Sequence, residues 1–249
     1  MLGAAPQLWW LWMAVVMLFF TVILSNLAPV LIFPLFFKYY PLENEELVTR
    51  LTNLAERAGA RVKGVYAFDL SSKTVAANAA VMGLGNTRRI VLADTLIDTF
   101  SVDEIETVLA HELGHHVHKD LTLGIVVQSV LMVFGFWLAD VVMRFGIAAL
   151  GYTGLTDPAA LPLLMVALTI FGLITMPLSN GWSRWREVKA DTYALQMTRR
   201  PDAFISAMTR LANQNLADTD PPAWVEFIFH SHPSISRRVA MAKGFQLSD

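Results

Sequence analysis

The chain contains two histidines four residues apart, with a glutamate beside the first. Residues of these types at this spacing can bind a metal ion and transfer a proton. Residues 111–115 read His-Glu-Leu-Gly-His. On a helix, positions i and i+4 share a face, so His111 and His115 can bind one metal ion together. Glu112 lies one position further round, where it can take a proton from an activated water without being a ligand. The pattern predicts one Zn²⁺ per chain in a hydrolytic site; the alternative is a surface helix with incidental histidines.

The residues before this motif favour a helix. Ser101 and Glu104 have the spacing of a capping box, in which each side chain satisfies a backbone N–H of the first turn. Apolar residues then follow at helical spacing: Ile105, Val108, Leu109 and Leu113. The two histidines are therefore expected on one face of a helix that begins near residue 101.

A catalytic zinc usually has three protein ligands and one open position. Glu187, 72 residues after His115, is the candidate third ligand. Asp191 lies four residues further on the same predicted helix face, where it could accept a hydrogen bond from the outer nitrogen of a ligand histidine. The alternative for Glu187 is a solvated charge paired with Arg184 or Lys189, and the local sequence by itself favours that alternative.

Composition points to a membrane protein. The chain is 55% hydrophobic and only 16% charged, against about 25% charged in a typical soluble domain. There is no cysteine, which excludes disulfides and thiolate metal ligands. The formal net charge of −2 gives no reason to expect a nucleic-acid partner.

Three stretches are apolar and long enough to cross a bilayer, which takes about 20 residues: 8–37, 121–139 and 158–183. Pro29 and Pro34 are expected to kink or end the first. A cleaved signal peptide is the alternative for that stretch, but no basic region precedes it and the apolar run is too long. The segment 140–157 links the last two spans and could extend either helix.

The spans constrain where the ligands lie. His115 comes just before the second span and Glu187 just after the third, so two crossings return the chain to the same side of the membrane. Lysines and arginines number nine in 38–120, nine in 184–249 and one in 140–157. This asymmetry predicts that the catalytic side is cytoplasmic.

The remaining segments predict a small mixed region. Helical spacing and turn residues give the expected elements: helices 44–58, 201–216 and 234–242, strands 62–70, 75–82 and 88–92, and a loop at Pro221–Pro222. We therefore expect an α-helical integral membrane protein with about three transmembrane helices and a small β-element. These elements divide the chain into four segments. Residues 1–37 form an N-terminal membrane segment, residues 121–183 form two membrane helices, and residues 38–120 and 184–249 form the two parts of a metalloprotease domain.

The motifs together resemble a known family. Residues 180–191 read N-x-x-S-R-x-x-E-x-x-A-D after the H-E-x-x-H motif, and this order resembles the membrane zinc metalloproteases of the CAAX prenyl protease 1 type and their HtpX-like heat-shock relatives. Further segments resemble the same family: 34–42, 78–79, 83–85, 89–96, 109–115 and 232–234 with Arg238. The resemblance covers about residues 25–243 and favours the CAAX-protease branch.

The resemblance implies roles for residues outside the metal motif. Asn78 and Ala79 match a strand edge that binds an extended substrate; the alternative for Asn78 is an ordinary turn residue. His232 matches a donor to the oxyanion of the transition state, and Arg238 a residue that orients His232 or the substrate. A loop histidine held by Pro233 is the alternative for His232. His116 and His118 are not expected as ligands.

The resemblance also implies the function, which is hydrolysis of peptide bonds in membrane-associated substrates, either prenylated CAAX peptides or misfolded membrane proteins. Relatives of this type have about four more membrane helices before the segment that matches 8–37, and a homo-oligomer is one way to complete such a chamber. One alternative is a catalytically inactive relative that binds membrane proteins. A metal transporter is another, but the intact Glu112 argues against it, as does the lack of intramembrane carboxylates or histidines beyond Asp140.

Overall fold

The computed structural model describes residues 3, 5–83 and 88–245, without the side chains of residues 29 and 30. Leu84 and Gly85, part of the segment 83–85 in the family resemblance, lie outside the described residues. Over this part of the chain, backbone contacts divide the protein into two compact units. The first unit contains residues 1–25 and 121–179, and the second contains 26–120 and 180–249.

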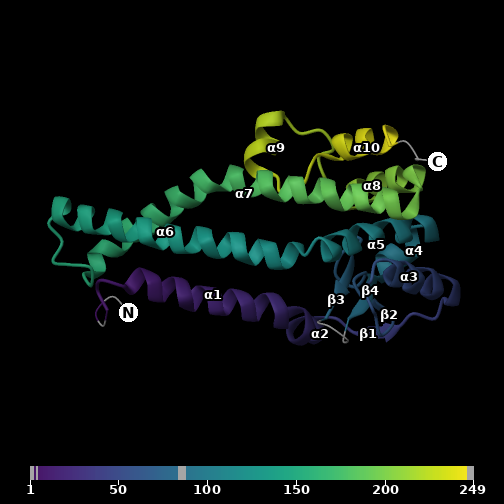
Figure 1. The fold of residues 1–249 in the computed structure, drawn as a ribbon, viewed down its shortest axis with the longest axis horizontal. Coiled ribbons are helices and arrows are strands. Elements are labelled where there is room, and N and C mark those ends of the chain that lie inside the picture. Colours follow the sequence, from purple (N-terminus) through teal and green to yellow (C-terminus); the bar gives the residue numbers. More distant parts are fainter. Residues whose placement is uncertain (1–2, 4, 84–87, 246–249) are drawn as a thin grey trace. The chain divides into compact units, whose positions relative to one another are not determined.

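Figure 1 shows the elements in chain order. Those of the first half are α1 (Trp9–Leu27), the π-helix η1 (Ala28–Ile32), α2 (Phe33–Phe36), β1 (Tyr39–Pro41), α3 (Glu45–Arg57), β2 (Val65–Phe68), β3 (Ala79–Met82), β4 (Arg89–Ala93), α4 (Asp94–Thr99) and α5 (Val102–Val117). Those of the second half are α6 (Asp120–Leu150), the 3₁₀ helix η3 (Pro158–Ala160), α7 (Leu161–Thr198), α8 (Pro201–Gln214), α9 (Ala223–Phe229) and α10 (Ile235–Lys243).

The first unit is built from long apolar helices that lie side by side: most of α1, α6 beyond its first residue, and the first half of α7 (Figure 1). Among the described residues, three helices are long and apolar enough to span a membrane. Glycines on α6 let α7 approach closely. A Cβ at Gly135 would lie 2.7 Å from the ring of Phe171, and one at Gly146 would overlap the side chain of Leu163.

Asp140 is a buried carboxylate within the long helix α6. Trp9 Nε1 donates a hydrogen bond to its Oδ1 at 2.6 Å, and Arg144 Nε donates to its Oδ2 at 2.8 Å. Arg144 also donates to the carbonyl oxygen of Pro6 at 2.7 Å. These contacts fix the start of α1 to α6 and give Asp140 a structural role, because its charge is paired rather than left open to a pathway.

The membrane helices differ from the predicted spans in where they end. The predicted second span stops at residue 139, and α6 continues to Leu150, so the linking segment 140–157 extends this helix, as the sequence analysis allowed; Asp140 and Arg144 pair with each other within it. The helix that holds the third span continues to Thr198. The first span is interrupted at Ala28–Ile32 by a π-helical turn that contains one of the prolines predicted to kink it.

In the second unit, the described strands form a four-stranded sheet of order β1-β2-β4-β3. β2 and β4 pair in parallel, and β1 and β3 are antiparallel edge strands. β2 and β3 are shorter than the predicted strands 62–70 and 75–82, whereas β4 has the predicted length and is displaced by one residue. The chain turns directly after β2. Asp94 Oδ1, at the start of α4, accepts hydrogen bonds from the backbone N–H groups of Leu70 and Ser71 at 3.0 and 2.9 Å. Neither β1 nor α4 was predicted.

Helix α5 connects the sheet to the rest of the second unit, since it packs against β3, α3 and α8. Its predicted capping box is present: Ser101 Oγ accepts from the backbone of Glu104, and Glu104 Oε2 accepts from the backbone of Ser101 at 2.7 Å. Glu104 is buried, accepts a hydrogen bond from Ser206 of α8 and forms an ion pair with Arg210 of the same helix at 2.9 Å. One carboxylate therefore both starts α5 and joins it to α8.

We expect the Glu104→Gln variant to lower the free energy of unfolding at neutral pH by about 1.5–3 kcal/mol, since hydrogen bonds to a charged group contribute about that much. Burial would raise the pKa of Glu104, but Ser206, Ser101 and Arg210 lower it below its ordinary value of 4.5. The contribution of Glu104 is therefore complete above pH 4.5 and is lost as the pH falls through its folded-state pKa.

Thermal or denaturant unfolding in detergent between pH 3 and pH 8 measures this difference, with Glu56→Gln on the exposed side of α3 as the control. The difference in the free energy of unfolding between Glu104→Gln and the unmodified protein should become smaller at acidic pH. A gap of equal size at all pH values would contradict the assigned charge.

Candidate metal centre

Helices α5 and α7 bring the predicted ligands together within the second unit. Nε2 of His111 and Nε2 of His115 lie 3.1 Å apart. The two carboxylate oxygens of Glu187 approach one histidine each, Oε2 at 3.4 Å from His111 Nε2 and Oε1 at 3.4 Å from His115 Nε2. The ligand atoms all lie within 4.8 Å of one another. One metal ion can therefore contact all three side chains.

The outer nitrogens of both histidines face carboxylates. His111 Nδ1 lies 2.8 Å from Asp191 Oδ1, and His115 Nδ1 lies 2.7 Å from Asp120 Oδ2. A carboxylate is an acceptor, so each Nδ1 carries a proton and each Nε2 of the neutral ring presents a lone pair. The two Nε2 lone pairs thus converge beside the Glu187 carboxylate.

This convergence is a test of whether the residues fit a metal. Glu187 is buried, and its Oε2 has no hydrogen bond in the described part of the chain. His232 Nδ1 lies 2.9 Å from that oxygen. Lone pairs that face one another are satisfied by a cation, and two imidazoles with one carboxylate are a donor set that zinc prefers. The site therefore fits the predicted Zn²⁺.

Asp120 is a site residue that the sequence analysis missed. In one continuous helix, a residue five positions after His115 would lie about 140° round the axis and could not reach it. Lys119, with φ of +55°, separates α5 from α6 and turns Asp120 back toward His115. Arg186 of α7 pairs with the other oxygen of Asp120 and donates to the carbonyl of His118 at 2.7 Å.

Asp191 has the position predicted for it, next to His111. It is fully buried, and Arg238 of α10 binds it with two hydrogen bonds, Nε to Oδ2 at 2.8 Å and Nη2 to Oδ1 at 2.5 Å. Arg238 was predicted to orient His232 or the substrate; its described hydrogen bonds instead go to Asp191, and a longer contact of 3.4 Å reaches His111 Nδ1. Each ligand histidine is therefore held by an aspartate that is itself paired with an arginine.

Gly114 allows α5 and α7 to approach at the centre. A Cβ at this position would lie 3.0 Å from the Cα of Ala190, tighter than nearly all such contacts. The glycine between the two histidines thus has a packing role, because a larger residue would push Glu187 away from the histidines.

Charge and burial act on the titrating groups. Burial by itself would lower the pKa of His111, but contacts with the Asp191 and Glu187 carboxylates raise it to about 9. The two carboxylates therefore favour a cation at this imidazole, and a metal ion at Nε2 would replace the proton that otherwise binds there. Burial raises the pKa of Glu112 above its ordinary value, against the opposing charges of His111 and His115. A raised carboxylate pKa suits a general base near neutral pH.

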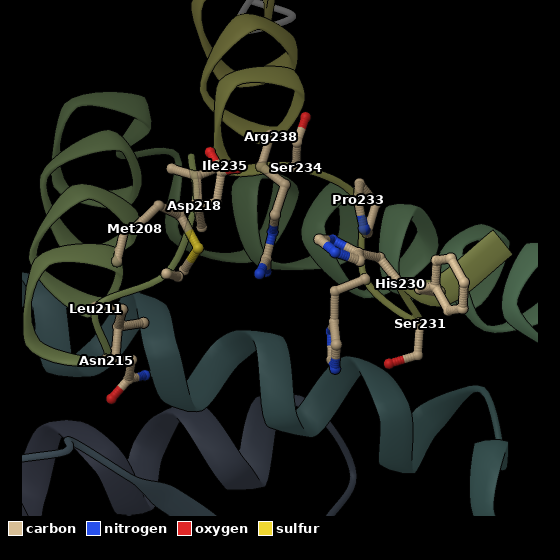
Figure 2. Close-up of a pocket in the computed structure, with 14 residues that line it drawn as sticks. Met208, Leu211, Asn215, Asp218, His230, Ser231, Pro233, Ser234, Ile235 and Arg238 are labelled. Carbon is tan, nitrogen blue, oxygen red and sulfur yellow. The ribbon is translucent and has the colours of Figure 1, made fainter. Parts of the chain in front are cut away.

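A cavity of about 490 Å³ opens beside the metal centre (Figure 2). Arg238 reaches into it from α10, and Met208 and Leu211 face it from α8. His232 lines the same cavity, so the cavity is continuous with the contact between His232 and Glu187. The lining combines apolar side chains with a few polar groups, as ligand pockets do.

The remaining predictions concern the substrate-binding residues and the two other histidines near the motif. Asn78 is exposed directly before edge strand β3, and Ala79 is the buried first residue of that strand. The position of β3 against α5 is therefore compatible with strand addition by a peptide. Neither His116 nor His118 is part of the group of ligand atoms found among the described residues.

Comparisons with known proteins identify relatives over nearly the whole chain. The family model described as Peptidase family M48 matches residues 41–246. The protein of Bacillus subtilis (strain 168) called "Uncharacterized metalloprotease YhfN" is 35% identical over 239 residues, which is 94% of this chain and 56% of that relative. "CAAX prenyl protease 1" of Saccharomyces cerevisiae is 32% identical over 250 residues, which is 92% of this chain and 54% of that relative.

A solved structure shows the same architecture. The crystal structure of S. mikatae Ste24p matches with a TM-score of 0.85 and 26% sequence identity, covering 98% of this chain and 60% of that one. The chain thus spans a little over half the length of these proteins.

We expect the Asp120→Ala variant to weaken zinc binding about 10- to 100-fold, the usual effect of removing a carboxylate that orients a ligand histidine. The Asp120→Asn variant should lose less zinc affinity, since its amide oxygen can still accept a hydrogen bond from His115. Competition with a chromogenic chelator measures the affinity of purified protein without any activity assay. Asp98→Ala, at an exposed position of α4, should bind zinc normally. An unchanged affinity in Asp120→Ala would refute the role of this contact.

Proposed function

We propose that this chain, which belongs to peptidase family M48, is a zinc-dependent endopeptidase of the membrane. The metalloprotease domain would comprise residues 38–120 and 184–249, and its substrates would be peptides or proteins associated with the bilayer. Self-association of the chain stays a prediction. The observation that carries the proposal is the convergence of two histidine lone pairs and a buried carboxylate from α5 and α7.

Zinc held by His111, His115 and Glu187 would supply a Lewis acid, which polarises a carbonyl and lowers the pKa of water towards about 7. Glu112 is next to the first ligand on the same helix and carries a raised pKa. Its carboxylate would accept the proton of the attacking water and then deliver a proton to the leaving amine. Asp191 and Asp120 would keep the ligand histidines in the required tautomer throughout.

The surroundings of the centre suggest how a substrate would be held. The exposed edge of β3, with Asn78 before it, can pair with an extended peptide through backbone hydrogen bonds. His232 lies within contact distance of Glu187 and lines the adjacent cavity. In this proposal its ring N–H would donate to the oxyanion that develops on the scissile carbonyl. The cavity would accept a substrate side chain next to the cleaved bond.

Relatives suggest the substrate class. Several are called CAAX prenyl protease 1 and others HtpX protease homologues, so prenylated CAAX peptides and membrane proteins are the two classes to test. A catalytically inactive, membrane-protein-binding chain is the second candidate. The filled positions at 111, 112, 115 and 187 favour the enzyme.

We expect Glu112→Gln to retain about one zinc per chain and to lose peptide cleavage by a factor of about 10²–10⁴, the usual contribution of a general base. Cleavage by the unmodified chain should rise with pH through the raised pKa of Glu112, since its carboxylate form accepts the proton. The assay uses purified protein in lipid with a farnesylated CAAX peptide and a membrane-protein substrate, beside a chelator control and Glu56→Gln.

The outcomes separate the candidates. Cleavage lost in Glu112→Gln and with chelator, but kept in Glu56→Gln, supports the peptidase, and the preferred substrate selects the branch. Bound zinc without cleavage of either substrate supports the inactive relative. Protein that binds no zinc excludes the proposed ligands.

The side on which the site lies is also a proposal, supported by eighteen lysines and arginines in the two segments that flank the membrane helices and one in 140–157. The chain has no cysteine, so single cysteines can report topology. We expect an impermeant maleimide to label Leu216→Cys in inverted vesicles and Thr156→Cys in right-side-out vesicles. Labelling of Leu216→Cys in right-side-out vesicles and of Thr156→Cys in inverted vesicles would place the metal site on the outer side of the membrane.

A further inference from the structure

Helix α9 presents aromatic side chains outward from the second unit. Trp224 and Phe227, three residues apart and so on one face, are 64% and 57% exposed. Glu226, on the opposite face, is 3% exposed and lies 3.3 Å from Arg237 of α10. The helix thus buries a carboxylate and exposes its largest apolar rings, which is the reverse of a helix that faces water.

The exposed face of α9 has a fixed position along α7. Asn180 Nδ2 donates to the carbonyl of Ile228 at 2.6 Å. Arg184 Nη1 donates to the carbonyls of Glu226 and His230 at 2.8 and 2.6 Å. Two polar side chains one turn apart on α7 therefore hold the C-terminal half of α9.

These two anchors lie where the apolar stretch of α7 ends. Residues 158–183 carry no charged side chain, and Arg184 is the first charge after them. Trp182 and Trp185 lie at the same level, and Lys189 Nζ is 3.7 Å from the ring centre of Trp185. Tryptophan beside lysine and arginine at the end of an apolar helix is typical of the bilayer–water boundary.

We propose that α9 is an interfacial helix whose Trp224 and Phe227 insert into the headgroup region of the bilayer on the side of the metal centre. Continuity with α7 selects lipid as the occupant, because α9 is bonded to the residues at which the membrane span ends. The guanidinium of Arg184, 5.9 Å from the ring of Phe227, adds positive charge that complements anionic headgroups.

An inserted α9 determines where the next loop lies. His230 follows the helix directly, and His232 contacts Glu187 two residues later. Arg184 holds the carbonyl of His230, so the same side chain joins the membrane-facing helix to the loop at the metal centre. The membrane depth of α9 does not depend on peptidase activity.

Spin labels on single cysteines can measure this depth, because the chain has no cysteine of its own. The test positions are Trp224→Cys and Phe227→Cys in the full chain, reconstituted in vesicles of phosphatidylcholine and phosphatidylglycerol. Leu216→Cys, at a position 92% exposed after α8, is the water control. Leu173→Cys, at a position 58% exposed within the charge-free stretch, is the bilayer control. Collision with oxygen and with a neutral nickel chelate gives the depth of each label.

We expect the labels at 224 and 227 to lie between the two controls, with more oxygen and less nickel collision than at 216. Collision rates equal to those at 216 would show that the face is in water and would overturn the proposal. Low rates with both reagents would also overturn it, since protein rather than lipid would then cover α9. Zinc content of each variant confirms that the second unit is folded.

Discussion

The structure around the metal centre depends on one contact, in which the lone pairs of two imidazole nitrogens and one carboxylate face one another. Helices α5 and α7 meet with His111 Nε2, His115 Nε2 and the Glu187 carboxylate directed at one another, an arrangement that is unfavourable unless a cation lies among them. The pairing of Asp191 with Arg238 and of Asp120 with Arg186 holds both histidines in this orientation. The small residue at Gly114 permits the helix contact, so packing and electrostatics support the same geometry.

Features that rest on local spacing could be predicted from sequence. The pair His111 and His115, the capping box at Ser101 and the apolar spans each depend on neighbours within a few residues, and the structure contains all of them. Glu187 needed more than spacing, because a charged residue on a helix is usually solvated; its motif supplied the information. The family resemblance read from those motifs is confirmed by the match to residues 41–246.

Features that depend on chain reversal or on tertiary contact could not be predicted. Asp120 lies near His115 only because Lys119 adopts a left-handed conformation, and no periodicity indicates such a break. Arg238 was expected to orient His232 or the substrate, which stays a prediction; its ion pair with Asp191, 47 residues away in sequence, had no signal in the local pattern. Helix α9, at seven residues, is too short for a periodic signal, and the prolines before it, the second of which is its N-cap, were interpreted as a loop.

The side chains of the metal centre come from segments on either side of two long apolar helices, which fixes the order in which the centre can assemble. His115 and Glu187 are separated by 72 residues, and these residues form the two long apolar helices α6 and α7. The third donor cannot meet the first two until both helices have entered the bilayer and the chain has returned to its original side. A metal ion that contacts all three side chains can therefore bind only after both helices are in place, so metal content would report on the insertion of α6 and α7.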